Sequence, residues 1–189
     1  MQQIAKCDLA DWAIFLANSM PIREAEWFLF PEKTKGFFAN RGLSGIDGNI
    51  ATIAGLSLGL NSPILGIVGD LTALHDLNSL TLLRNLPVVL LISNNDGGGI
   101  FSHLAVAADP HFEKLWGCPH GYTFKDAAKM FGLEYAFADS EESLSQSLEQ
   151  ALQNQVGCIL EVATSREKNI ALHKALSKIK NSRMAGCAG

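Results

Sequence analysis

Hydrophobic residues occur in short continuous runs along this chain, separated by segments in which they recur at helical spacing. The runs at 63–68 and 87–93 have the length and composition of strands buried on both faces of a sheet. Shorter apolar runs predict further strands at 13–17, 36–40, 133–138 and 158–163. Helices are predicted between the strands at 21–30, 48–60, 72–84, 124–131, 143–154 and 167–179. This alternation predicts an α/β fold with a mostly parallel sheet and helices on both faces.

We expect residues 1–180 to form a single domain and residues 181–189 to form a frayed tail. A chain of 189 residues is long enough to bury one good core. The stretch at 94–122 has no helical or strand period, and it contains three histidines, His103, His111 and His120. Structureless loops of this length are uncommon in compact domains, so we expect a functional loop or an interface element there.

Composition narrows the class of protein. Hydrophobic residues make up 48% of the chain, the mean hydropathy is +0.14, and the formal net charge is −4. A chain with this charge and no dense basic run is not expected to bind nucleic acid. It has neither an apolar stretch of about 18 residues nor a secretory signal pattern, so we expect no membrane segment and a cytoplasmic location. The four cysteines are scattered and are expected to be reduced thiols.

Candidate chemistry lies where the two buried strands end. The first run is followed by Gly69 and Asp70, and the second by Asn94, Asn95 and three glycines at 97–99. Open α/β sheets bind ligands at the carboxyl ends of their strands. If the two strands are neighbours, Asp70 and Asn95 can each offer a side-chain oxygen to one cation, and the glycine backbone can add a carbonyl. Oxygen ligands suit Mg²⁺, which also binds phosphates. We therefore predict a magnesium and diphosphate site.

Each half of this site also has a plain structural interpretation. Asp70 is a favourable N-cap for a helix that follows it. Asn94, Asn95 and Asp96 before a glycine form an ordinary turn sequence. Both interpretations stay open at this point.

The order of these residues resembles a known motif. A Gly-Asp-Gly-like start followed after about 25 residues by Asn-Asn is the signature of thiamine diphosphate enzymes, although Leu71 replaces the last glycine here. Four short sequence motifs are similar to those of the 2-succinyl-5-enolpyruvyl-6-hydroxy-3-cyclohexene-1-carboxylate synthase (MenD) family of menaquinone biosynthesis. They are NSMPIR at 18–23, NRGLSGIDG at 40–48, GDLTALHDLN at 69–78 and NNDGGGIF at 94–101.

The resemblance implies the thiamine diphosphate-binding fold and a larger protein. The family has three domains, and this chain corresponds to the last of them, the diphosphate-binding domain. The family enzyme decarboxylates 2-oxoglutarate and adds the product carbanion to isochorismate, using thiamine diphosphate and Mg²⁺. Its active site is built between subunits, which implies a homo-oligomer that includes the amino-terminal domains absent from these residues.

The resemblance also implies roles for particular residues. The Mg²⁺ ligands would be the side chains of Asp70 and Asn95 and the carbonyl of Gly97. Ile46 matches the position that holds the cofactor in its bent form. The alternative is that Ile46 is an ordinary residue of the hydrophobic core. Cofactor contacts would come from Gly69, Asp70, Leu71, Ile46, Asn95, Gly97, Gly98, Ile100 and Phe101. Glycines at 69, 97 and 98 would let the backbone approach the phosphates without a Cβ in the way.

Substrate carboxylates are expected to meet arginine, because a guanidinium binds a carboxylate through two parallel hydrogen bonds. Arg23 and Arg41 lie in the matching motifs, and Ser19 lies one helical turn before Arg23. We expect these three residues to bind substrate, with Leu104 as a further candidate. For each arginine, a surface salt bridge is the plain alternative.

No catalytic residue is expected in this chain. In the family, the glutamate that activates the cofactor belongs to the amino-terminal domain of the other subunit, and no glutamate here lies in a matching motif. We therefore expect the isolated chain to be inactive. Two alternatives remain, namely a domain of another thiamine diphosphate enzyme such as an acetolactate-synthase-like decarboxylase, and a non-catalytic binding module. His75 is expected to pack rather than to react, and the three loop histidines match no zinc spacing.

Overall fold

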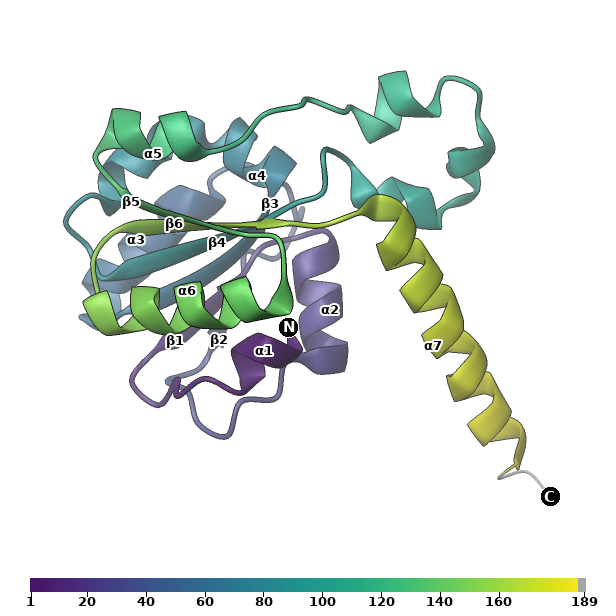
Figure 1. Ribbon diagram of the computed structural model, residues 1–189, viewed down its shortest axis with the longest axis horizontal. Helices are drawn as coiled ribbons and strands as arrows, with labels where there is room; N and C mark the ends of the chain where they lie inside the picture. Colours follow the sequence, from purple (N-terminus) through teal and green to yellow (C-terminus); the bar gives the residue numbers. More distant parts are fainter. Residues whose placement is uncertain (187–189) are drawn as a thin grey trace.

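The protein, described here from a computed structural model, is built on one parallel sheet of six strands (Figure 1). The structure describes the backbone of residues 1–186 and the side chains of residues 1–177. The strand order is β2-β1-β3-β4-β6-β5. The strands are β1 (Ala13–Leu16), β2 (Phe37–Phe38), β3 (Ile64–Gly69), β4 (Val88–Asn94), β5 (Glu134–Ala138) and β6 (Cys158–Ala163). The α/β prediction and the parallel sheet are confirmed.

Helices cover both faces of the sheet (Figure 1). One core lies between the sheet and α3 (Asn49–Leu60), α4 (Asp70–His75), the 3-10 helix η1 (Leu77–Leu83) and α5 (Lys125–Phe131). The other core lies under α1 (Gln2–Ala5), α2 (Met20–Phe28) and α6 (Glu141–Asn154). The central strands are buried on both faces because their residues are apolar without alternation, as the sequence predicts.

The register of the strands brings four chain segments to one edge of the sheet. Leu16 at the end of β1 pairs with Ile67 of β3. Gly69 at the end of β3 pairs with Ser93 of β4, and Asn94 pairs with Ala163 of β6. The chain leaves β1 for β2 on one side and returns to β3 on the other, so the strand order reverses between β1 and β3. Ligands of open α/β sheets bind at such a reversal, outside the carboxyl ends of the strands.

The predicted helix at 72–84 is wrong in one respect, because it is interrupted at Asp76. The Asp76 carboxylate is buried and accepts the backbone N–H groups of Ile50 and Ala51, at 2.8 and 3.2 Å, and the Ser79 hydroxyl at 2.6 Å. It thus satisfies the free amides at the start of α3. The chain leaves α4 at His75 and continues as η1, since Asp76 is held by another helix.

We expect Asp76→Ala to lower the free energy of unfolding by about 2 kcal/mol, because it removes a charged cap and leaves buried amides unpaired. Urea unfolding measures this change. Ser79→Ala removes only the hydroxyl contact and should cost less than about 1 kcal/mol. Equal losses in the two variants would contradict the capping role.

Other differences from the predicted elements are local. The one-turn helix α1 was not predicted, and its Ile4 is buried against the α6 side of the sheet. The helix expected to end at Ile179 is α7 (Arg166–Gly186), so residues 181–186 are helical, while 187–189 lie outside the described residues. The irregular stretch at 94–122 contains three short turns of helix, Gly99–His103, Ala105–Ala108 and Glu113–Gly117.

Two further observations bear on the class of protein. Cys7, Cys118 and Cys158 are free thiols, and Cys187 lies outside the described residues. Across residues 1–186, no helix combines the length and the apolar character needed to cross a membrane.

Candidate functional site

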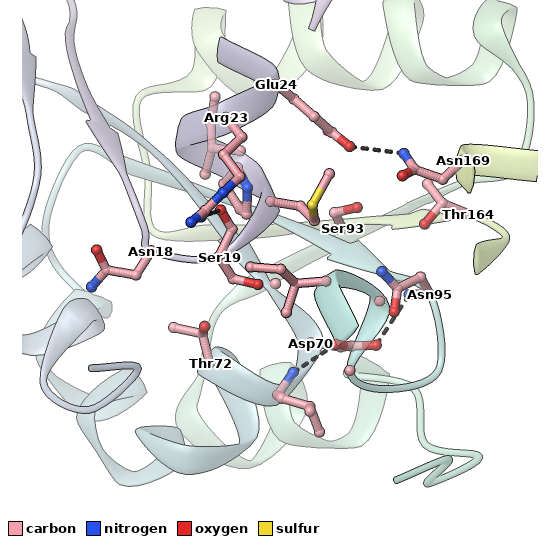
Figure 2. Close-up of a pocket in the computed structure, with 18 of the residues that line it drawn as sticks. Asn18, Ser19, Arg23, Glu24, Asp70, Thr72, Ser93, Asn95, Thr164 and Asn169 are labelled. Carbon is pink, nitrogen blue, oxygen red and sulfur yellow. Dashed lines mark hydrogen bonds between the residues drawn. The ribbon is translucent and has the colours of Figure 1, made fainter. Parts of the chain in front are cut away.

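A cavity of about 560 Å³ opens at the carboxyl edge of the sheet (Figure 2). It is lined by the segments that follow β1, β3, β4 and β6. In Figure 2, Asn18 and Ser19 come from the end of β1, Asp70 from the end of β3, Asn95 from the end of β4 and Thr164 from the end of β6. The two halves of the predicted site therefore lie in one cavity.

Asp70 lies at the floor of this cavity and is buried. Its Oδ2 accepts the backbone N–H of Asn95 at 3.1 Å and that of Gly97 at 2.9 Å, and it lies 3.3 Å from His120 Nε2. Its Oδ1 accepts the N–H of Leu71 at 2.7 Å. Asp70 is the first residue of α4 rather than its N-cap, which is Gly69. The carboxylate therefore ties the β3 end to the β4 loop.

Asn95 supplies the feature that most favours a bound cation. Its Oδ1 is buried and has no hydrogen-bond partner among the described residues. A buried polar atom without a partner is costly, and a bound ion or water usually satisfies it. The Gly97 carbonyl accepts the N–H of Gly99 at 3.0 Å and keeps a second lone pair. A carboxylate, an amide oxygen and a carbonyl form a donor set that fits Mg²⁺.

The structure gives a different reason for two of the glycines than the one expected. A Cβ on Gly97 would collide with the Gly117 carbonyl, and a Cβ on Gly98 would collide with the Trp116 carbonyl. Gly98 N–H also donates to the Gly117 carbonyl at 2.7 Å. These glycines therefore let the loop pack on the Glu113–Gly117 turn. Of the three predicted glycines, Gly69 alone has an open Cβ direction, as an approach to phosphate requires.

The predicted substrate residues Ser19, Arg23 and Arg41 line the same cavity. Arg23 Nη1 donates to the Ser19 carbonyl at 2.6 Å, and Arg41 Nη1 donates to Asn18 Oδ1 at 2.9 Å. Asn18 is buried and donates to the Gly45 carbonyl at 2.6 Å. Ser19 has a φ of 75°, a strained value for a residue with a Cβ, and such strain concentrates at binding sites. Arg166 also lines the cavity, so three guanidinium groups border it.

The apolar candidates divide between two places. Ile46, Leu71, Ile100 and Phe101 line the cavity together with Gly69 and the metal-ligand candidates. Leu104 does not line it. Its exposed side chain borders a separate hollow with His103 and His173, so the structure does not bring Leu104 to the other substrate candidates.

Several lining residues were not predicted. Thr164 directly follows β6, and Asn18 lies two residues after the end of β1, so the rule that singled out Asp70 could also have found them. Glu24 and Asn169 meet through a hydrogen bond of 2.8 Å across 145 residues, drawn in Figure 2, and no local pattern predicts that pair.

The three loop histidines are dispersed rather than clustered. The side chain of His120 is mostly buried beside Asp70 and stacks on Tyr122. His103 lies near Asn169, and His111 lies near Asp109. Only His120 therefore reaches the residues of the proposed metal site.

Comparison with known proteins gives a consistent result. Residues 24–162 match the family model described as thiamine pyrophosphate enzyme, C-terminal TPP binding domain. The chain is similar to 2-succinyl-5-enolpyruvyl-6-hydroxy-3-cyclohexene-1-carboxylate synthases. It is 46% identical over 168 residues to that of Rubrobacter xylanophilus, which covers 88% of this chain and 29% of the relative. It is 44% identical over 171 residues to that of Chlorobium phaeobacteroides, which covers 87% of this chain and 29% of the relative.

A solved structure agrees at the level of the fold. It is an X-ray structure from Mycobacterium smegmatis assigned as a thiamin diphosphate-dependent enzyme, with a TM-score of 0.71 and 20% identity. The match covers 87% of this chain and 31% of that chain. The chain thus spans under a third of the length of these relatives.

Proposed function

Because this chain belongs to the family of C-terminal thiamine pyrophosphate-binding domains of thiamine pyrophosphate enzymes, we propose that it binds the cofactor's diphosphate through Mg²⁺ at the carboxyl edge of its sheet. The metal ligands are the side chains of Asp70 and Asn95 and the carbonyl of Gly97. The observation that carries this proposal is the buried, unpartnered Oδ1 of Asn95 in the cavity that also holds Asp70.

The other lining residues have roles that follow from their chemistry. Gly69 leaves room for phosphate oxygens, since nothing lies near its missing Cβ. Ile46, Leu71, Ile100 and Phe101 give the cavity apolar walls that exclude water and support a ring system. When bound, thiamine diphosphate supplies a thiazolium carbon that adds to the keto carbon of a 2-oxo acid.

For the whole enzyme, we propose the 2-succinyl-5-enolpyruvyl-6-hydroxy-3-cyclohexene-1-carboxylate synthase reaction, with 2-oxoglutarate and isochorismate as substrates. Both substrates carry carboxylates, and Arg23 and Arg41 at the cavity offer the matching guanidinium groups. Ser19 adds a hydroxyl beside Arg23. These residues bind and orient the substrates.

The reaction requires partners beyond these residues. We propose that the domain works with amino-terminal domains of the same enzyme, in a homodimer located in the cytoplasm. The described cysteines are free, which agrees with a reducing compartment. The glutamate that activates the cofactor is supplied by that amino-terminal part, so the chain alone does not turn over.

A titration tests the binding step. We expect thiamine diphosphate to release heat on binding to the 189-residue chain in the presence of Mg²⁺ and to give no signal with EDTA in its place. Thiamine without the diphosphate serves as the control ligand and should not bind measurably. Equal binding with and without Mg²⁺ would refute the proposed metal site.

A chimera tests the reaction. The chain replaces the matching segment of the Rubrobacter xylanophilus relative, which supplies the remaining domains. Consumption of 2-oxoglutarate that depends on isochorismate supports the proposed synthase. Consumption of pyruvate instead would indicate an acetolactate-synthase-like enzyme, and a folded chimera that binds cofactor without any turnover would indicate a non-catalytic module.

A further inference from the structure

A buried carboxylate lies behind the proposed metal site. Glu161 belongs to β6, pairs with Ile92 of β4 and Phe137 of β5, and is only 1% exposed. Removing a charge from water is costly, and the cost is offset only where good hydrogen bonds surround the group. An apolar residue would fill the same position at a lower cost. The carboxylate of Glu161 therefore indicates a role other than packing.

The hydrogen bonds of Glu161 point in two directions. Its Oε2 accepts the backbone N–H of Phe124 and the hydroxyl of Tyr135, each at 2.8 Å. Its Oε1 accepts Asn94 Nδ2 at 2.7 Å. Burial, and then the hydrogen bond and charge of Glu161, raise the pKa of Tyr135 far above its usual value, so the phenol stays protonated and remains a donor.

Hydrogen bonds to Glu161 and to other groups fix the position of Asn94. Its Nδ2 also donates to the Tyr122 carbonyl at 2.9 Å, and its Oδ1 accepts the N–H of Asp96 at 3.1 Å. Its backbone carbonyl accepts the N–H of Thr164 at 2.8 Å. A rotated amide would place its NH₂ group against the N–H of Asp96 and its oxygen against the Glu161 and Tyr122 acceptors. Glu161 is therefore one of three partners that hold the orientation of Asn94, and it is the charged one.

Asn95 lies between these two fixed points. The residue before it is held by Glu161, and the residue after it is tied back to the Asn94 side chain. The N–H groups of Asn95 and Gly97 then point to Asp70. We propose that Glu161 is a positioning residue, which acts through Asn94 to aim the Asn95 oxygen and the Gly97 carbonyl at the cation.

The inference rests on the proposed function for the identity of the ligand, but it has a readout that does not need the ligand. Hydrogen exchange of the Asn95 and Gly97 amides reports their bonds to Asp70 directly. In Glu161→Gln, the amide oxygen can still accept the hydrogen bonds from Phe124 and Tyr135. The amide NH₂ group then faces Asn94 Nδ2. We expect about 10-fold faster exchange at these two amides and about 10-fold weaker binding of thiamine diphosphate in the presence of Mg²⁺.

A matched control removes a different bond from the same carboxylate. Tyr135→Phe deletes the hydroxyl that donates to Oε2 and leaves Asn94 untouched. It should lower the melting temperature, yet leave exchange at Asn95 and Gly97 and the binding of cofactor within about twofold of the parent chain.

Reversing the polarity of the bond completes the test. Asn94→Asp alone places two carboxylates face to face and should loosen the loop as Glu161→Gln does. In the double variant N94D/E161Q, the new amide NH₂ group on β6 can donate to the new carboxylate on β4, while the new amide oxygen keeps Phe124 and Tyr135. The new carboxylate cannot donate to the Tyr122 carbonyl as Asn94 Nδ2 does, so recovery should be partial. We expect the double variant to show slower exchange at Asn95 and Gly97 and tighter cofactor binding than either single variant.

Different outcomes separate the two proposals. Unchanged exchange at Asn95 and Gly97 in Glu161→Gln, uniformly faster exchange throughout the sheet, or a double variant worse than either single variant would overturn the positioning role. Absence of Mg²⁺-dependent binding in the parent chain would overturn the proposed function, while the exchange data still decide what Glu161 does.

Discussion

Asp70→Asn is expected to weaken Mg²⁺-dependent binding of thiamine diphosphate by about 100-fold, or roughly 2.7 kcal/mol. The substitution removes the only formal negative charge in the proposed ligand set. It also sets donors against donors, because an amide NH₂ at the Oδ2 position faces the N–H groups of Asn95 and Gly97, and one at Oδ1 faces that of Leu71. Titration calorimetry on the 189-residue chain measures the loss.

The control for this variant is the same Asp-to-Asn substitution at a position far from the cavity. Asp11 is exposed and precedes β1, at the opposite edge of the sheet. Asp11→Asn should bind the cofactor as the parent chain does. If Asp70→Asn also binds unchanged while it stays folded by circular dichroism, Asp70 does not hold the metal.

Gly97→Ala is expected to abolish measurable cofactor binding and to lower the free energy of unfolding by about 2 kcal/mol. Gly97 has a φ of 127°, a conformation that an L side chain rarely adopts. A Cβ there would also meet the backbone carbonyl of Gly117, which cannot turn aside as a flexible side chain can. The loop must therefore move, and the Gly97 carbonyl moves with it.

The matched control is another glycine-to-alanine change. Gly55 lies on the exposed side of α3, and no atom from outside the local helix backbone lies within 4 Å of the position of its missing Cβ. Alanine is favoured over glycine within a helix by up to about 1 kcal/mol, so Gly55→Ala should be neutral or stabilising. Urea unfolding and calorimetry on both variants give the comparison. If Gly97→Ala still binds cofactor, the loop can adapt to the added Cβ. That result would contradict the conclusion that the Gly117 carbonyl leaves no space for it.

The two variants address different parts of one site. Asp70 supplies charge and accepts the N–H groups of Asn95 and Gly97, so Asp70→Asn should remove the charge and weaken these two loop contacts without any steric collision. Gly97 allows two backbone segments to lie in close contact. Its replacement should move the proposed metal ligands without changing their chemical groups. A crystal structure of each variant would separate these effects.

The sheet and part of the site could be predicted because their signals are local. The apolar runs that became β3 and β4 determine which residues are buried on both faces, and the residues that follow them determine what lies at the sheet edge. Asp70 and Asn95 were found in this way. The helix at 72–84 was predicted as continuous because helical periodicity carries no information about Asp76, whose partners on α3 are 25 and 26 residues away.

By itself, the sequence determined the α/β alternation, the parallel sheet and the residues that follow its strands, since periodicity and short motifs act within a few residues. The tertiary structure alone decided which distant groups meet. Gly97 and Gly98 pack on the Glu113–Gly117 turn, Leu104 faces a different hollow from Ser19, and Glu161 reaches Asn94 across 67 residues. These contacts depend on strand order and on the path of long loops, because a hydrogen bond or a close packing contact requires two groups to meet in space, whatever their separation along the chain.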